Sequence, residues 1–234
     1  MQTEARPVRP RQFVSYTFFK VDPSWRALDS AAKRRAREQF TAVVDDFRTS
    51  IFLRSYSLVG IRGDCDLLLW AAASELDIFN RLNGELNMSA LGPYLSRPYS
   101  LLAGLRRSTY MPEHERDLHE QNLEGRSGYR RYLFVYPFVK QRAWYALPKA
   151  ERQAMMNEHF EIGGRYPEFE ISTSYSFGLD DQEFVVSFEG DDPHRFADLV
   201  SELRDSKASA FTLRDTPTFT CIRKPLEEAL ELLG

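Results

Sequence analysis

Cysteine and histidine are both scarce in this chain of 234 residues, which has two cysteines and four histidines. Two cysteines cannot build a disulfide scaffold or a cysteine-based metal cluster, so we expect Cys65 and Cys221 to be buried structural thiols. The few histidines restrict imidazole chemistry to a few positions. A basic excess is also missing, because 31 Lys and Arg residues stand against 34 Asp and Glu residues. This balance argues against nucleic acid as the main partner.

Long hydrophobic runs are absent as well. The apolar run at 67–73 is far shorter than the roughly 20 residues that a membrane span needs. Residues 1–11 are polar and proline-rich, and they lack the apolar region of a secretory signal. With 43% apolar and 28% charged residues, the composition is that of a globular protein. We therefore expect a soluble protein of a reducing compartment, the cytoplasm, without a membrane span.

A weak internal repeat runs through the chain. The phrase Trp25-Arg-Ala-Leu28 recurs 119 residues later as Trp144-Tyr-Ala-Leu147. At the same offset of 119, Tyr56 maps onto Tyr175. At an offset of 117, four residues map in order onto Phe196, Leu199, Glu202 and Leu203, and they are Phe79, Leu82, Glu85 and Leu86. Such an ordered series indicates two homologous halves, which we place at 11–110 and 129–225. The charged segment 111–128 is then a connecting loop, and we interpret its histidines, His114 and His119, as solvated.

Each half predicts the same order of elements. Residue type and periodicity predict two strand–helix–strand–strand–helix–strand series. The first is at 13–20, 31–47, 51–59, 67–72, 74–86 (with Ser74 as helix N-cap) and 97–110, and the second at 131–139, 148–161, 169–177, 183–188, 193–204 and 217–223. This order is ferredoxin-like. Helices would cover one face of each sheet, so the two bare faces should close on each other. The predicted fold class is α+β, with duplicated ferredoxin-like halves forming a dimeric α+β barrel.

One position differs informatively between the halves. Phe40, on the apolar face of its predicted helix, corresponds at the 119-residue offset to His159, which should therefore also point toward the sheet. An inward histidine is a hydrogen-bonded core residue, a metal ligand or an acid–base group. Its neighbours do not complete the ligand spacing of a zinc or non-haem iron site. A lone inward imidazole suits a cofactor that brings its other ligands with it, as haem does.

Two further segments carry chemistry in the second half. Tyr136, Phe138 and Lys140 are two residues apart, so they share one face of their strand. If that face lines the barrel, a phenol and an ammonium share one wall. They form either an anion-binding, redox-competent pair of phenol and ammonium near a cofactor carboxylate, or a strand tyrosine with Lys140 reaching solvent. Arg204 and Ser209 offer a guanidinium and a hydroxyl to a carboxylate. Arginine at a helix C-terminus is equally explained by the helix dipole.

Four ordered phrases of the second half resemble the chlorite dismutase-like haem proteins, and within them the coproheme decarboxylases. The phrases span 136–140, 144–148, 151–159 and 178–184, and read YPFVK, WYALP, ERQAMMNEH and GLDDQEF. The resemblance covers most of the chain and is strongest from Tyr132 to Cys221. It implies a dimeric α+β barrel assembled as a homopentamer, with haem in the C-terminal half.

The resemblance also implies roles for single residues. His159 matches the proximal iron ligand, Tyr136 the tyrosine that relays a radical to a propionate, and Lys140 the lysine beside it. Arg204 and Ser209 match residues that hold propionates. A further propionate arginine of the family has no clear counterpart, with Arg126 and Arg131 as candidates.

The distal position departs from the pattern of chlorite dismutases. Their distal arginine aligns with Ile171, and a slip of one residue gives Glu170 or Ser172, so no register supplies an arginine. Splitting chlorite needs a cation that confines the departing oxyanion, so this difference counts against that activity. No obvious distal acid–base residue takes its place.

The resemblance thus implies an oxidoreductase, a peroxide-dependent coproheme decarboxylase of haem synthesis. Its partners would be coproheme and hydrogen peroxide, and its cofactor haem, as coproheme III or haem b with its iron. Peroxide oxidation would pass to Tyr136, whose radical abstracts hydrogen from a propionate β-carbon with release of CO2. Two alternatives stay open: a chlorite dismutase or haem peroxidase, and a non-enzymatic haem-binding or haem-delivery protein.

Overall fold

The computed structural model describes residues 11–106, 108–111, 123 and 127–234. His114, His119 and Arg126 lie outside the described residues. Most of the predicted connecting loop is therefore not part of the description that follows.

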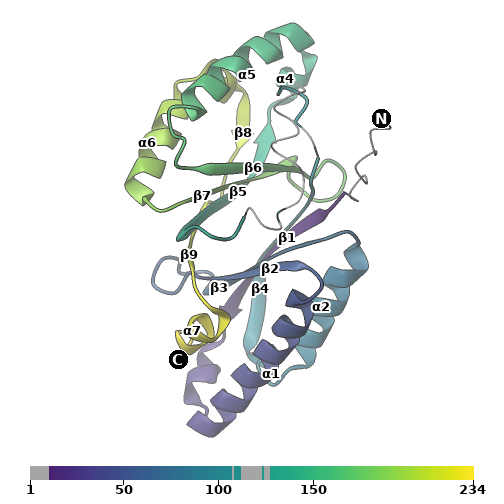
Figure 1. Ribbon diagram of the computed structural model, residues 1–234, viewed down its shortest axis with the longest axis vertical. Helices are drawn as coiled ribbons and strands as arrows, with labels where there is room; N and C mark the ends of the chain where they lie inside the picture. Colours follow the sequence, from purple (N-terminus) through teal and green to yellow (C-terminus); the bar gives the residue numbers. More distant parts are fainter. Residues whose placement is uncertain (1–10, 107, 112–122, 124–126) are drawn as a thin grey trace, which may run out of the picture.

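Nine strands form one antiparallel sheet that closes on itself (Figure 1). The strands are β1 (Phe13–Val21), β2 (Phe52–Ser57), β3 (Leu67–Ala73), β4 (Leu95–Gly104), β5 (Tyr132–Lys140), β6 (Glu170–Tyr175), β7 (Phe184–Gly190), β8 (Thr212–Arg214) and β9 (Phe219–Arg223). Their order is β7-β6-β4-β1-β3-β2-β9-β5-β8, and β7 also pairs with β5. This last pairing closes eight of the strands into a ring, which is the predicted barrel.

The helices lie outside the ring in two groups (Figure 1). One group covers the first half and consists of α1 (Ser30–Arg48), α2 (Leu76–Met88) and α7 (Leu226–Glu231). The other covers the second half and consists of α5 (Lys149–Gly163) and α6 (Pro193–Arg204), with the short α4 (Arg142–Ala146) and the 3-10 turn η3 (Lys207–Phe211) nearby. Two other short turns, η1 (Pro23–Ala27) and η2 (Gly92–Tyr94), flank β1 and β4. Among the described residues, no helix is both long and apolar enough to cross a membrane.

Alternation along the strands fills the barrel interior with side chains from both halves. In β1, Val14, Tyr16 and Phe18 point inward, and Phe18 stacks on Phe219 of β9 with ring centroids 4.0 Å apart. Both cysteines are free, fully buried and part of this interior cluster, as the sequence predicts. The two half-sheets thus bury their inner faces against each other.

The observed elements follow the predicted order, with local corrections. Ser74 does not cap α2, because the helix begins at Leu76 and its N-cap residue is Glu75, whose side chain makes no capping hydrogen bond. The fourth strand of the first half ends at Gly104 rather than continuing to Tyr110. The helix α7 was not predicted, and it packs in the core of the first half although it follows the second half in sequence.

Candidate functional site

The outer face of the second half-sheet is an apolar surface beneath α5 and α6. The register of β5, β7 and β6 aligns Phe134 with Phe188 and Phe188 with Ile171, so these three share the helix-covered face. Phe134 also stacks on Phe196 of α6, with ring centroids 3.8 Å apart and planes at 10°. The apolar cluster on this face is therefore built largely with α6.

The helix α5 packs much less apolar surface against the sheet than α1 does in the first half. Ile162 is the buried residue of α5, whereas α1 buries Ala36, Phe40, Val44 and Phe47. At the 119-residue offset, Phe40 and Val44 correspond to His159 and Gly163. A Cβ added at Gly163 would lie 3.9 Å from Cδ1 of Ile171, whose side chain is 44% exposed. The helix α5 and the sheet beneath it thus leave the apolar surface between them incompletely covered.

His159 lies half-buried on α5, at the position equivalent to the fully buried Phe40. Burial, together with the positive charge of Lys140, lowers the pKa of the imidazole to about 4. At neutral pH the ring is therefore uncharged, and a neutral imidazole nitrogen is the form that binds a metal ion.

Tyr136 points to the helix-covered face and not into the barrel, so the barrel-facing orientation that the sequence allows is not the one adopted. The interior positions of β5 are Leu133 and Val135, whereas Tyr136 packs in the outer cluster and stacks on Phe188, with ring centroids 6.1 Å apart. Burial raises the pKa of its phenol well above the usual value. None of the described residues makes a hydrogen bond to the hydroxyl, which leaves it available to a ligand.

Lys140 is a buried ammonium group, so the alternative in which it reaches solvent is wrong. Its Nζ donates a hydrogen bond of 2.5 Å to the carbonyl of Ala208 in η3 and lies 4.6 Å from the ring centroid of Trp144. Its backbone N–H donates to Glu183 Oε2 at 2.8 Å. Burial lowers the pKa of the ammonium to about 8.

Arg204 and Ser209 lie on either side of the turn that leads from α6 into η3. Arg204 is the last residue of α6, and its Nη2 is 2.5 Å from Oδ2 of Asp215. Both charges act on Tyr136, because Asp215 raises and Arg204 lowers the pKa of its phenol. Ser209 is half-buried, and its backbone N–H donates to the carbonyl of Ser206 at 3.0 Å. The structure thus brings Arg204 into the electrostatic surroundings of Tyr136.

Three functional groups of this region escaped the sequence analysis. Asp215 pairs with Arg204, the Ala208 carbonyl holds Lys140, and Glu183 accepts hydrogen bonds from Lys140 and, at 2.6 Å, from the Tyr145 hydroxyl. A backbone carbonyl leaves no signal in a sequence. Asp215 precedes a Thr-Pro pair, which reads only as a turn.

The donor set fits one kind of metal group better than others. Within the described part of the chain, no three His, Cys, Asp or Glu side chains gather as they would around a bare metal ion. One neutral imidazole above an apolar sheet face, with a phenol, an ammonium and a guanidinium at its margin, instead suits an iron porphyrin. Such a group supplies four nitrogen ligands itself, and its propionates need cationic or hydroxyl partners.

Comparisons with known proteins agree with this arrangement. Residues 33–224 match the model of the chlorite dismutase family. The chain is 30% identical over 179 residues to a coproheme decarboxylase of Mycolicibacterium smegmatis, covering 76% of this chain and 75% of that protein.

Solved structures with the same fold include a mutant chlorite dismutase from Candidatus Nitrospira defluvii, 27% identical, with a TM-score of 0.86 and coverage of 95% of both chains. A structure of chlorite dismutase from the same organism in complex with imidazole has the same identity and TM-score, and covers 95% of this chain and 94% of that one. From the family match and these likenesses, the chain is a member of the chlorite dismutase family and has the fold of its solved members.

Proposed function

We propose that the chain binds coproheme between α5 and the outer face of β5–β7 and decarboxylates it with hydrogen peroxide to haem b. The observation that carries this proposal is the replacement of Phe40 in the first half by the neutral, half-buried His159 in the second. His159 is the residue proposed to hold the iron, and Ile171 of β6 is proposed to contact the porphyrin. The coproheme decarboxylase of M. smegmatis supports this choice of substrate.

The porphyrin's propionates would meet the polar margin of the site. Arg204 and Ser209 are the proposed carboxylate partners, and Lys140 adds a positive charge that is buried. Arg131 remains a candidate for one more propionate, and in this structure its guanidinium lies 5.2 Å from the ring centroid of Tyr132. Held in this way, a propionate would be presented to the face on which Tyr136 lies.

The chemistry requires an oxidant and a hydrogen acceptor. When bound, an iron porphyrin supplies a strong oxidant on reaction with hydrogen peroxide. Tyr136 would then lose one electron and its phenolic proton, and the resulting phenoxyl radical would take a hydrogen atom from the propionate β-carbon. Loss of a second electron and of CO2 leaves a vinyl group. From a propionate carboxylate, each decarboxylation thus yields two electrons and one proton, which together with one proton from the solvent reduce one hydrogen peroxide to two water molecules.

Incubation with iron coproporphyrin III and hydrogen peroxide, followed by mass spectrometry of the porphyrins, tests the proposal. We expect two successive losses of formic-acid mass, because each propionate becomes a vinyl group. Tyr136→Phe should still bind coproheme, by its Soret band, but should stop conversion. Normal conversion by this variant would rule out the radical role of Tyr136.

Chlorite splitting is the second candidate, because the structural neighbours named above are chlorite dismutases. Arginine is absent from positions 170–172, where the resemblance aligns the distal arginine of those enzymes. We therefore expect oxygen release from chlorite to be slow, and rapid release measured with an oxygen electrode would favour this function instead. Haem binding without turnover of either substrate would favour the haem-delivery alternative.

We further propose that the two halves arose by duplication of a ferredoxin-like unit. The strand orders β4-β1-β3-β2 and β9-β5-β7-β6 are equivalent in the two halves, which supports the boundaries 11–110 and 129–225 with 111–128 between them. We also propose a cytoplasmic homopentamer, which sedimentation of the purified protein and fractionation of cells would test.

A further inference from the structure

Arg204 carries its own counter-ion in this structure. The side chain of Arg204 is 55% exposed, whereas that of its partner Asp215 is 20% exposed. A guanidinium paired to one carboxylate at 2.5 Å offers less of its donor edge to another. A ligand carboxylate that uses Arg204 must therefore compete with Asp215.

Asp215 lies on a turn that the other half of the chain holds in place. Arg62, in the loop between β2 and β3, donates a hydrogen bond of 2.8 Å to the carbonyl of Thr218. Arg62 is itself fixed by two hydrogen bonds to Asp64, of 2.7 and 2.6 Å, and lies over the ring of Phe219. The turn carrying Asp215 is thus anchored, whereas the Arg204 side chain is 55% exposed at the end of α6, so Arg204 is the partner free to swing.

The position of this turn relates the ion pair to Tyr136. The turn connects β8 to β9, and both strands pair with β5, the strand that carries Tyr136. The opposite effects of Asp215 and Arg204 on the pKa of the Tyr136 phenol agree with this placement. A porphyrin carboxylate next to Tyr136 would therefore enter the surroundings of the ion pair.

We propose that Asp215 is a placeholder carboxylate, which pairs with Arg204 in the absence of ligand and is exchanged for a carboxylate of the bound porphyrin. The inference rests on the proposed function and adds a residue that sets the affinity for the ligand's carboxylates. With this exchange, the guanidinium is paired both before and after a ligand arrives. The exchange also weakens ligand binding, because one ion pair must open for another to form.

Equilibrium binding of metal-free coproporphyrin III, followed by its fluorescence, tests the exchange without turnover. We expect Asp215→Asn to lower the dissociation constant about two- to fivefold, the range that follows from the strength of exposed ion pairs. Asp205→Asn is the matched control, because Asp205 adjoins Arg204, is exposed and forms no ion pair within the described residues. It removes the same charge and should change affinity less than twofold.

A double-mutant cycle with Arg204→Ala separates the exchange from general charge effects. In the Arg204→Ala background, Asp215→Asn should no longer improve binding. An unchanged or weaker affinity of the Asp215→Asn single variant, or an equal gain in both backgrounds, would overturn the placeholder role while leaving porphyrin binding intact. If the unmodified chain binds neither metal-free nor iron coproporphyrin, the proposed function and this inference are overturned together.

Discussion

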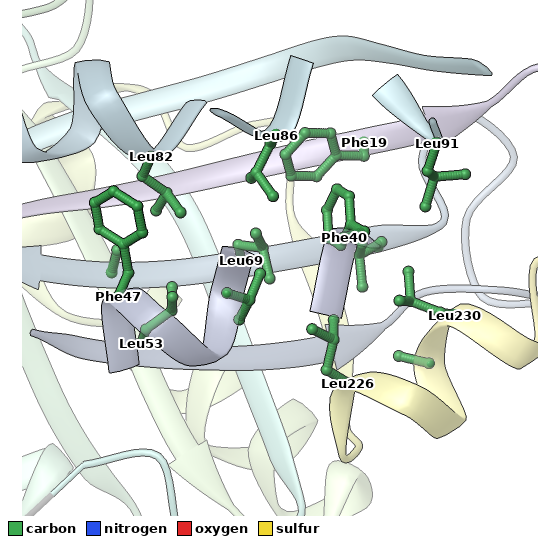
Figure 2. Packing of buried hydrophobic residues seen from close by; sticks show 14 of the residues in the cluster. Phe19, Phe40, Phe47, Leu53, Leu69, Leu82, Leu86, Leu91, Leu226 and Leu230 are labelled. Carbon is green, nitrogen blue, oxygen red and sulfur yellow. The ribbon is translucent and has the colours of Figure 1, made fainter. Parts of the chain in front are cut away.

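The two halves of the barrel have the same strand order but fill the space beneath their first helix differently. In the first half, Phe40 of α1 is fully buried and packs edge-on against Phe19 of β1, among the leucines of α2 and α7 (Figure 2). In the second half, the equivalent α5 presents His159 and Gly163 over an apolar sheet face. One half is thus packed as a closed core, whereas the other leaves apolar surface beneath its first helix incompletely covered. The difference teaches that side-chain volume on one helix, and not topology, distinguishes the half with a filled core from the half that we propose binds the porphyrin.

The largest effect on stability should come from removing the aromatic side chain that fills the core of the first half. Truncation of Phe40 to Ala should lower the free energy of unfolding by about 3–5 kcal/mol, because it leaves a cavity in a closed core. The equivalent truncation, His159→Ala, should change it by less than about 1 kcal/mol, because surface beneath α5 is already uncovered. Urea denaturation of the ligand-free proteins measures both, and equal losses would contradict the comparison.

Replacing His159 by phenylalanine, the residue at the equivalent position of the first half, should weaken the proposed haem binding. We expect His159→Phe to weaken haem binding on the order of a hundredfold, since even partners of metal ligands contribute 10- to 100-fold. The Soret titration is the measurement, with Met155→Leu on the same helix as the control that keeps its affinity. An unchanged spectrum for His159→Phe would show that another residue holds the iron.

His159, which has no titratable counterpart at Phe40, should make the free energy of unfolding depend on pH. Burial lowers the pKa of His159 from 6.5 to about 4, so the unfolded chain binds more protons between these values. The part of the unfolding free energy that depends on His159 should therefore rise with pH from about 4 to 6.5, by at most about 1.4 kcal/mol per unit. Above pH 6.5 it should be constant.

Comparing His159→Phe with the unmodified protein in urea at pH 5 and pH 7 isolates this contribution. The variant should show a smaller loss of stability at pH 5. Identical losses would mean that the imidazole is not shielded from water by α5 and the sheet.

The smallest effect should come from Gly163, which stands where the first half has Val44. The added Cβ of Gly163→Ala would make an ordinary contact with Ile171, so the variant should be more stable by about 0.5–1 kcal/mol. Val44→Ala, its counterpart in the filled half, should lose stability instead. A loss in Gly163→Ala by thermal denaturation would show that α5 is already in close contact with β6.

Much of this arrangement could be predicted from periodicity. The helix and strand order and the inward position of His159 follow from apolar spacing and the internal repeat. The period of two places Tyr136 and Lys140 on one face of β5, but it cannot say which, because both faces of the strand are covered by apolar layers. The sequence therefore allows the barrel interior, whereas the structure places Tyr136 in the outer cluster with α6 and buries Lys140 against η3.

Contacts that depend on turn geometry could not be predicted. Asp215 reaches Arg204 because the turn between β8 and β9 brings it there, and no spacing rule connects residues on a turn and a helix end. Ser74 has the residue type of an N-cap, yet the backbone begins the helix one residue after Glu75. The sequence shows that Asp215 and Ser74 are polar, but their partners depend on the folded positions of the turn and the helix end.

The last helix has a consequence for the order in which the protein is made. Leu226, Ala229, Leu230 and Leu233 belong to the core beneath α1 and α2 (Figure 2). During synthesis, the first half therefore waits for residues that leave the ribosome after every strand of the second. The core of the half that has no proposed ligand is thus completed by residues that are synthesised after the strands of the half that is proposed to bind one.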